Sequence, residues 1–114
     1  MEDLPIEALT QLAAYFQALS EPTRLHILSL LRGGERNVGE LAQLCDYTSA
    51  NISRHLAILS QHGLVARENR GTSVYYRIAD ASIYSLCDLV CSHIARQFEQ
   101  QANVQRSFES ASRS

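Results

Sequence analysis

The spacing of apolar residues changes twice along this chain of 114 residues, and this change restricts the folds that the chain can form. Up to Gly63 the apolar residues recur at steps of three and four, which is typical of amphipathic helices. Residues 64–79 show a pattern typical of strands, and the helical spacing returns from Ala81 to about Gln100. The sequence therefore predicts a mainly α-helical fold that contains one β-hairpin.

Four helices are predicted before the hairpin, and the last two of them are short and close together. The four helices cover residues 6–19, 22–32, 38–45 and 49–62. A turn of about four residues joins the last two, which together form a helix-turn-helix. The predicted hairpin follows, with Gly71 in its turn at a position where a positive φ is expected.

Charge is distributed unevenly, although the whole chain has a formal net charge of only -2. All ten basic residues are arginine, whose side chain can bind phosphate or guanine through two parallel hydrogen bonds. Residues 47–78 contain four arginines and one carboxylate, which gives this segment a net charge of +3: Arg54, Arg67, Arg70, Arg77 and Glu68. A basic segment on an otherwise acidic chain is compatible with a polyanion as partner, although such a cluster taken alone is more often just a solvated face.

A helix-turn-helix followed by a basic hairpin is a winged helix-turn-helix, an arrangement that predicts binding to double-stranded DNA. The second helix of such a unit lies in the major groove, and arginines of the hairpin reach phosphates or an adjacent minor groove. The helix that begins at Ser49 suits this role, because its start carries short polar side chains and no acidic residue. A helix N-terminus itself attracts phosphate.

Two other classes of function are considered for the same surface. A winged helix can bind a protein partner through its hairpin and fourth helix instead of DNA. An enzyme is not expected, because the sequence shows no Ser/His/Asp grouping, phosphate loop or pair of carboxylates that a common cleft would hold.

Two stretches resemble the ArsR/SmtB family of bacterial winged-helix repressors: LSEPTRLHILSLL, and NVGELAQLCDYTSANISRHLAILSQHGLVARENRGTSVYYRIAD. The resemblance covers residues 6 to 98. It implies a homodimer that pairs through the first and last helices, binds a palindromic DNA operator and is released by an inducer. For the recognition helix and its cap, the DNA-binding residues implied are Thr48, Ser49, Asn51, Ser53, Arg54 and His55. For the hairpin, or wing, they are Arg67, Arg70 and Thr72.

The apolar faces of the first and last helices also favour a dimer. They are broader than one small domain can cover alone, and pairing two copies would bury them. We therefore predict a winged-helix DNA-binding and dimerisation domain over residues 1–100. Residues 101–114 are polar and rich in serine, and they are predicted to form a flexible tail.

The usual inducer sites of the family are only partly matched by this sequence. The arsenic-type signature has two cysteines, and their positions are occupied here by Asn37 and Gly39. The zinc site of the last helix aligns with Asp80, Ser82, His93 and Arg96. Only two of these four match, and an arginine is incompatible with the usual geometry of a zinc site. Neither conventional site is therefore expected.

Cys87 and Cys91 are the remaining candidates for an inducer site. They lie four residues apart on the last predicted helix and so share one face. Two such thiolates can chelate a thiophilic ion such as As(III), Sb(III), Cd(II), Pb(II) or Cu(I), with Cys45 or the partner subunit supplying a third ligand. Alternatively, an oxidant or a persulfide modifies these thiols, or the cysteines are buried core residues. DNA binding itself is expected to need no cofactor.

The remaining observations concern the compartment. No apolar run approaches the roughly 18 residues that a membrane span needs. The first ten residues lack the basic leader and apolar block of a secretory signal, and three cysteines do not suit a disulfide framework. We therefore expect a cytoplasmic protein that has no membrane partner.

Overall fold

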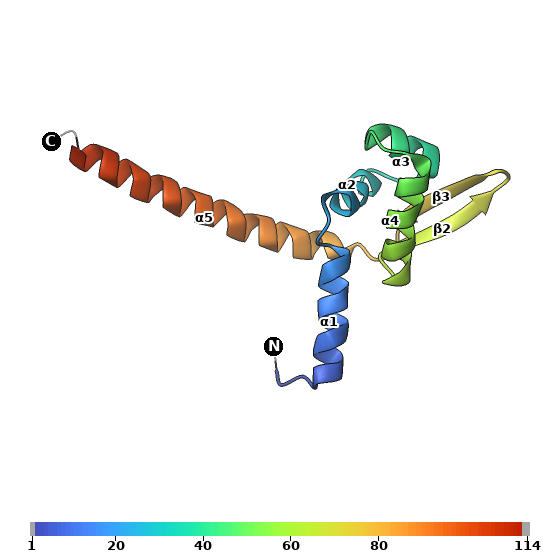
Figure 1. Ribbon diagram of the computed structural model, residues 1–114, viewed down its shortest axis with the longest axis horizontal. Coiled ribbons are helices and arrows are strands. Elements are labelled where there is room, and N and C mark those ends of the chain that lie inside the picture. Colours follow the sequence, from blue (N-terminus) through green and yellow to red (C-terminus); the bar gives the residue numbers. More distant parts are fainter. Residues whose placement is uncertain (1, 113–114) are drawn as a thin grey trace. The chain divides into compact units, whose positions relative to one another are not determined.

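The computed structural model describes residues 2–112, in which five helices and three short strands follow one another along the chain (Figure 1). They are α1 (Ile6–Ala18), α2 (Pro22–Leu31), β1 (Arg36–Asn37), α3 (Val38–Leu44), α4 (Ser49–Gln61), β2 (Val65–Arg70), β3 (Ser73–Ile78) and α5 (Ser82–Ser112). The contacts divide the chain into two compact units, residues 1–80 and residues 81–114. The prediction of a mainly helical winged helix-turn-helix is confirmed.

Side chains fix where the two helices of the helix-turn-helix begin. At α3, the Asn37 side chain accepts a hydrogen bond from the backbone N–H of Glu40 at 2.8 Å, and the Glu40 carboxylate accepts one from the backbone N–H of Asn37 at 3.1 Å. At α4, the Thr48 hydroxyl accepts the backbone N–H of Asn51 at 3.1 Å. Each cap satisfies N–H groups that have no partner within the helix, and so sets the first residue of that helix.

The core of the first unit lies between the helices and the base of the hairpin. Helix α4 contributes Ile52, Leu56 and Leu59, which are fully buried and follow the predicted spacing of four and three residues. The other core side chains of this unit come from α1, α2, α3 and the hairpin: Ala18, Ile27, Leu28, Leu31, Leu41, Ala42, Leu64, Val65 and Tyr76. One face of α4 is therefore held firmly, which leaves its opposite face to carry function.

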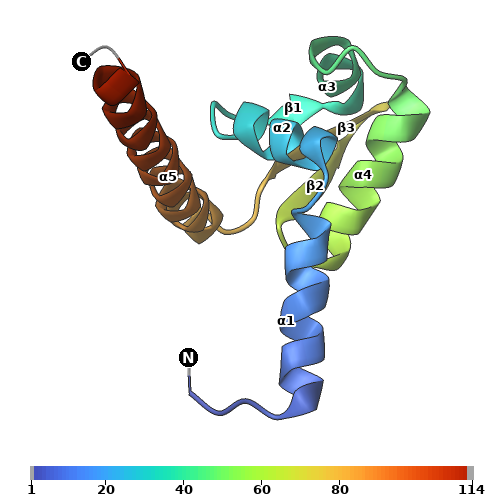
Figure 2. The same ribbon diagram turned by 60° about the vertical axis from the view of Figure 1, so that its left-hand side comes forward.

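The three strands form one antiparallel sheet in the order β1-β3-β2 (Figure 2). Strand β1 was not predicted, because two residues are too few for any periodic pattern. It pairs Arg36 with Tyr76 and Asn37 with Tyr75, both on β3. The predicted hairpin is confirmed, and Gly71 in its turn has a φ of 62°. The base of the hairpin packs against α4 and α2, while its tip extends beyond the helices (Figure 1).

Helix α5 forms the second unit and is longer than predicted. It runs without a break to Ser112, whereas the sequence pattern predicted a helix to about Gln100 and a flexible polar tail over 101–114. That prediction is corrected for residues 101–112, where six of the twelve residues are good helix formers and no glycine or proline interrupts the helix. Residues 113 and 114 lie outside the described residues. No helix within residues 2–112 is long and apolar enough to cross a membrane.

Candidate nucleic-acid interface

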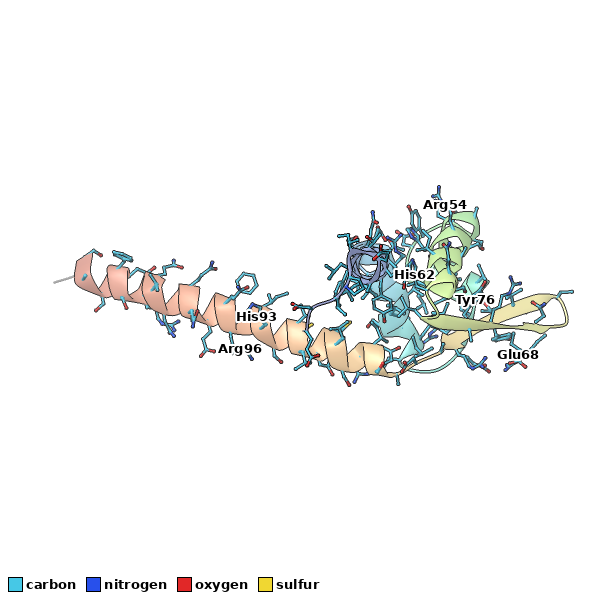
Figure 3. The ribbon with its side chains drawn as sticks, turned by 90° about the horizontal axis from the view of Figure 1, so that it is seen from below. Arg54, His62, Glu68, Tyr76, His93 and Arg96 are labelled. Carbon is cyan, nitrogen blue, oxygen red and sulfur yellow. The ribbon has the colours of Figure 1, made fainter. Side chains whose placement is uncertain are left out.

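The start of α4 presents a group of polar side chains to solvent, which we call the recognition face: Thr48, Ser49, Asn51, Ser53 and Arg54. All are exposed except Asn51, which is half-buried. The first turn of α4 contains no acidic residue. The Arg54 guanidinium donates a hydrogen bond to the Asn51 side-chain oxygen and projects from the outer side of the helix (Figure 3). The recognition face therefore combines short polar groups, helix N–H dipoles and one cation.

His55 was predicted with the recognition face, but the structure places its ring elsewhere. Its side chain is only 13% exposed, and Nδ1 lies 3.3 Å from Nη1 of Arg24 and 3.8 Å from Oε2 of Glu21. The ring of Tyr47 lies at a tilt, with the two ring centroids 6.1 Å apart. His55 therefore links α4 to the start of α2, and it does not share the open surface of Arg54.

The two wing arginines point to opposite sides of the hairpin. Successive side chains of a strand alternate between faces, and residues directly paired across two strands share a face. Arg67 pairs with the buried Tyr76, so it lies on the face that packs against α4. Arg70 is three positions further along β2 and therefore lies on the other face, with Glu68. Figure 3 shows Tyr76 on the side of Arg54 and Glu68 on the side away from it.

Arg70 is held by two carboxylates and an aromatic ring. Its guanidinium forms two hydrogen bonds to Glu35, at 2.6 and 2.9 Å, and one to Glu68 at 2.9 Å, while the centroid of the Tyr75 ring is 4.7 Å away. Hydrogen bonds to Glu35 and Glu68 raise the pKa of Arg70 further above its usual range, and the hydrogen bond from Arg70 lowers the pKa of Glu68. The charge of Arg70 is thus largely compensated within the chain.

The other predicted wing residues are less constrained. Arg67 is exposed and has one long contact, 3.4 Å from its Nη2 to the side-chain oxygen of Asn69. Thr72 is exposed in the turn at the tip of the hairpin. On the side of the hairpin that faces α4, Arg67 is therefore the wing cation best placed to act together with Arg54.

The three cysteines differ in their surroundings, and none forms a disulfide. Cys87 is half-buried and Cys91 is exposed, one turn apart on α5. Cys45 ends α3 and is half-buried, and burial raises the pKa of its thiol, which disfavours the thiolate that a metal needs.

Within the described chain, no three or more His, Cys, Asp or Glu residues gather in a way that would hold a metal ion. This applies to the zinc-type positions, of which His93 and Arg96 on α5 are labelled in Figure 3. Residues 2–112 of a single chain therefore offer a thiol pair and not a complete metal site.

Known proteins are similar to this chain in sequence over most of its length. A family model described as a helix-turn-helix domain matches residues 19–68. The transcriptional regulator NmtR of Mycobacterium tuberculosis is 34% identical over 90 residues, which are 79% of this chain and 75% of that protein. A homolog of the transcriptional repressor SmtB from Synechocystis sp. is 32% identical over 93 residues, which are 82% of this chain and 70% of that protein.

A solved structure extends the similarity to the fold. It is the solution structure of a homodimeric winged helix-turn-helix DNA-binding domain, Mb0332 from Mycobacterium bovis, described as "a possible ArsR-family transcriptional regulator". The TM-score is 0.74 at 34% identity, over 88% of this chain and 93% of that one. These relatives are regulators of transcription and not enzymes, which confirms the prediction that this chain is not an enzyme. The chain belongs to the ArsR/SmtB family of winged-helix transcriptional repressors.

Proposed function

We propose that this protein represses transcription as a homodimer that binds a palindromic DNA operator and leaves it when an inducer binds. The observation that carries the proposal is the recognition face of α4, which is polar, free of acidic residues in its first turn and backed by a fully buried apolar face. In this role α4 enters the major groove, and Arg54 bonds guanine or phosphate. The homodimeric DNA-binding domain of the M. bovis relative supports the same assembly.

Exposed apolar side chains on two helices support the dimer. On α1, Ile6 is 69% exposed and Phe16 is 47% exposed. On α5, Leu89, Val90, Ile94 and Phe98 are also exposed. Apolar surface of this extent is typical of a face that another protein covers, and a second copy of the chain has the matching face. Pairing would present two recognition helices to successive turns of one face of the duplex.

Salt dependence tests DNA binding against the protein-partner alternative. An operator duplex selected from a random library is titrated with the protein at 50–200 mM salt (about a fourfold range) in a mobility-shift assay. Affinity is expected to fall steeply, because each neutralised phosphate contributes about 0.9 to the slope of log affinity against log salt. Selected sequences with twofold symmetry would support the palindromic operator. Failure to select any duplex, or an affinity insensitive to salt, would contradict the proposal.

For the inducer, we infer a thiophilic metal or metalloid, As(III), Sb(III), Cd(II) or Pb(II), bound by Cys87 and Cys91. The two thiols lie one turn apart on α5, and Cys91 is open to solvent. Because one chain gathers no third ligand for them within residues 2–112, the partner subunit or a solvent molecule completes the site. The alternative, oxidation or persulfidation of the same thiols, is favoured by the exposure of Cys91.

Releasing Arg70 from its carboxylates is expected to strengthen operator binding. In Glu35→Gln with Glu68→Gln, the guanidinium loses both charged partners and becomes free to bind a phosphate. We expect an affinity gain of about two- to fivefold and a salt slope that is steeper by about 0.9 per subunit. Arg70→Ala alone is expected to weaken binding while the dimer stays intact.

The matched control for this pair places the two glutamine substitutions in the Arg70→Ala background. In the Arg70→Ala background, the two substitutions can affect DNA binding only by reducing the negative charge of the protein. The slope of log affinity against log salt should therefore stay the same. An equal gain in operator affinity in the parent and in the Arg70→Ala background would show that Arg70 does not bind phosphate after its release.

A further inference from the structure

Arg24 lies where three helices of the first unit meet. Its Nε donates to the backbone oxygen of Ala18 at 2.6 Å, and its Nη2 donates to the backbone oxygen of Gln17 at 3.2 Å. Both carbonyls belong to the last turn of α1, where helix carbonyls lack partners within the helix. The third contact of the guanidinium, from Nη1, is to Nδ1 of His55 on α4 at 3.3 Å. A single side chain of α2 therefore bonds the end of α1 and the recognition helix together.

The His55 ring is fixed on several sides. Arginine has only donors, so Nδ1 is the acceptor in this hydrogen bond. The carboxylate of Glu21 lies 3.8 Å from the same nitrogen and accepts the backbone N–H of Arg24 at 3.1 Å. Tyr47, from the turn before α4, covers part of the ring. A side chain that is held in this way cannot turn outward without breaking the junction.

We propose that Arg24 and His55 are positioning residues, which fix the direction of the recognition face relative to α1 and touch no DNA themselves. This rests on the proposed function, in which the exposed side of α1 pairs two copies of the chain. In such a dimer the angle between α1 and α4 decides how far apart, and in which direction, the two recognition faces lie. A junction that holds this angle makes the dimer selective for one spacing of the operator half-sites.

The chemistry of the two side chains makes the proposal testable. The planar guanidinium presents several donors in a fixed fork, whereas lysine has one compact ammonium group and cannot reach all three acceptors together. Arg24→Lys therefore keeps the charge and loses the junction. Asparagine carries an oxygen near the position of the histidine Nδ1, and leucine fills similar space without an acceptor. His55→Asn and His55→Leu are thus a pair of similar shape, in which only asparagine offers an acceptor to the guanidinium.

The experiment compares operator duplexes whose half-sites are at the selected spacing or one base pair closer or further apart. The parent and His55→Asn are expected to discriminate against the altered spacings. Arg24→Lys and His55→Leu are expected to lose most of this discrimination, and to bind the selected operator about five- to tenfold more weakly. The double variant should be no weaker than the weaker single variant, and salt slopes should stay at the parental value because no phosphate contact is lost.

Several results would overturn the proposal. Equal behaviour of His55→Asn and His55→Leu, or additive losses for Arg24→Lys and His55→Leu, would show that the two residues are not coupled. A changed base preference at one operator position in the His55 variants, with Arg24→Lys unaffected, would make His55 a base reader. If Arg24→Lys does not fold, the comparison of His55→Asn with His55→Leu still tests whether the acceptor at position 55 is needed. A parent protein that selects no duplex would instead contradict the proposed function.

Discussion

Arg54→Ala is expected to reduce operator affinity by about 1–3 kcal/mol per half-site, or roughly 5- to 150-fold for each half-site. The guanidinium is exposed at the start of α4 and is oriented by its hydrogen bond to Asn51. The neighbours that hold the helix in place, Ile52 and Leu56, are fully buried on the opposite face. The substitution therefore removes a DNA contact and leaves the support of the helix unchanged. Mobility-shift titration measures the loss, and sedimentation confirms that the dimer persists.

Two companion variants separate the contributions to this loss. Arg96→Ala removes the same charge from α5, which takes no part in the recognition face, and should bind operator almost like the parent. Arg54→Lys keeps the charge but cannot form two parallel hydrogen bonds to guanine. If Arg54 reads a base, the lysine variant loses selectivity at one position of the operator and keeps the salt slope. Parental affinity in Arg54→Ala would show that α4 does not enter the groove.

The elements that could be predicted from sequence are those whose residues carry a periodic pattern. The buried positions of α4 repeat every three or four residues, and Gly71 adopts the positive φ that the hairpin turn requires. Strand β1 gave no signal because two residues contain no period. The end of α5 was missed for a different reason: its last turns are polar, and exposed helix and flexible tail have similar compositions when no glycine or proline separates them.

The structure shows where the side chains of the candidate site lie, whereas their contact with DNA stays a prediction. Arg54 is exposed as expected, whereas His55 and Arg70 are engaged by residues far away in the sequence. The partner of His55 is Arg24, 31 positions earlier, and one partner of Arg70 is Glu35, 35 positions earlier. Such contacts arise only when β1 and β3 pair and α2 packs on α4. The net charge of residues 47–78 therefore overstated the positive charge that the wing can offer to DNA, because it left out Glu35.

The alternation of the hairpin has a direct bearing on how the wing works. Arg67 and Arg70 are both in β2, but their positions differ by three, an odd number, so their side chains lie on opposite faces of the strand. Arg67 shares the side of α4 and is the natural companion of Arg54. Arg70 stabilises the wing through its carboxylates and can bind phosphate only by exchanging them. Exposed ion pairs of this kind are weak, so such an exchange costs little.

Replacing Cys87 and Cys91 by serine is expected to abolish the response to inducer while leaving DNA binding intact. In the parent protein, a saturating inducer should weaken operator binding by about 5- to 150-fold, the usual range for coupling between two sites. Serine keeps the size of each side chain and removes the sulfur that a thiophilic ion requires. The reduced protein–operator complex is titrated with each of several compounds, and the fraction of operator released is measured: arsenite, antimonite, Cd(II), Pb(II), Zn(II) and a persulfide donor. For the double variant, the operator affinities with and without each compound should be nearly equal.

The matched control for the double variant is Cys45→Ser, which removes a sulfur from the end of α3. Burial raises the pKa of the Cys45 thiol, so this thiol resists deprotonation, and the variant should respond to inducer like the parent. Reversal distinguishes the two chemistries of Cys87 and Cys91: a chelator restores DNA binding after metal, whereas only a reducing thiol restores it after oxidation or persulfidation. Normal release of the double variant from its operator would place the inducer site away from α5, and loss of release in Cys45→Ser would add Cys45 to it.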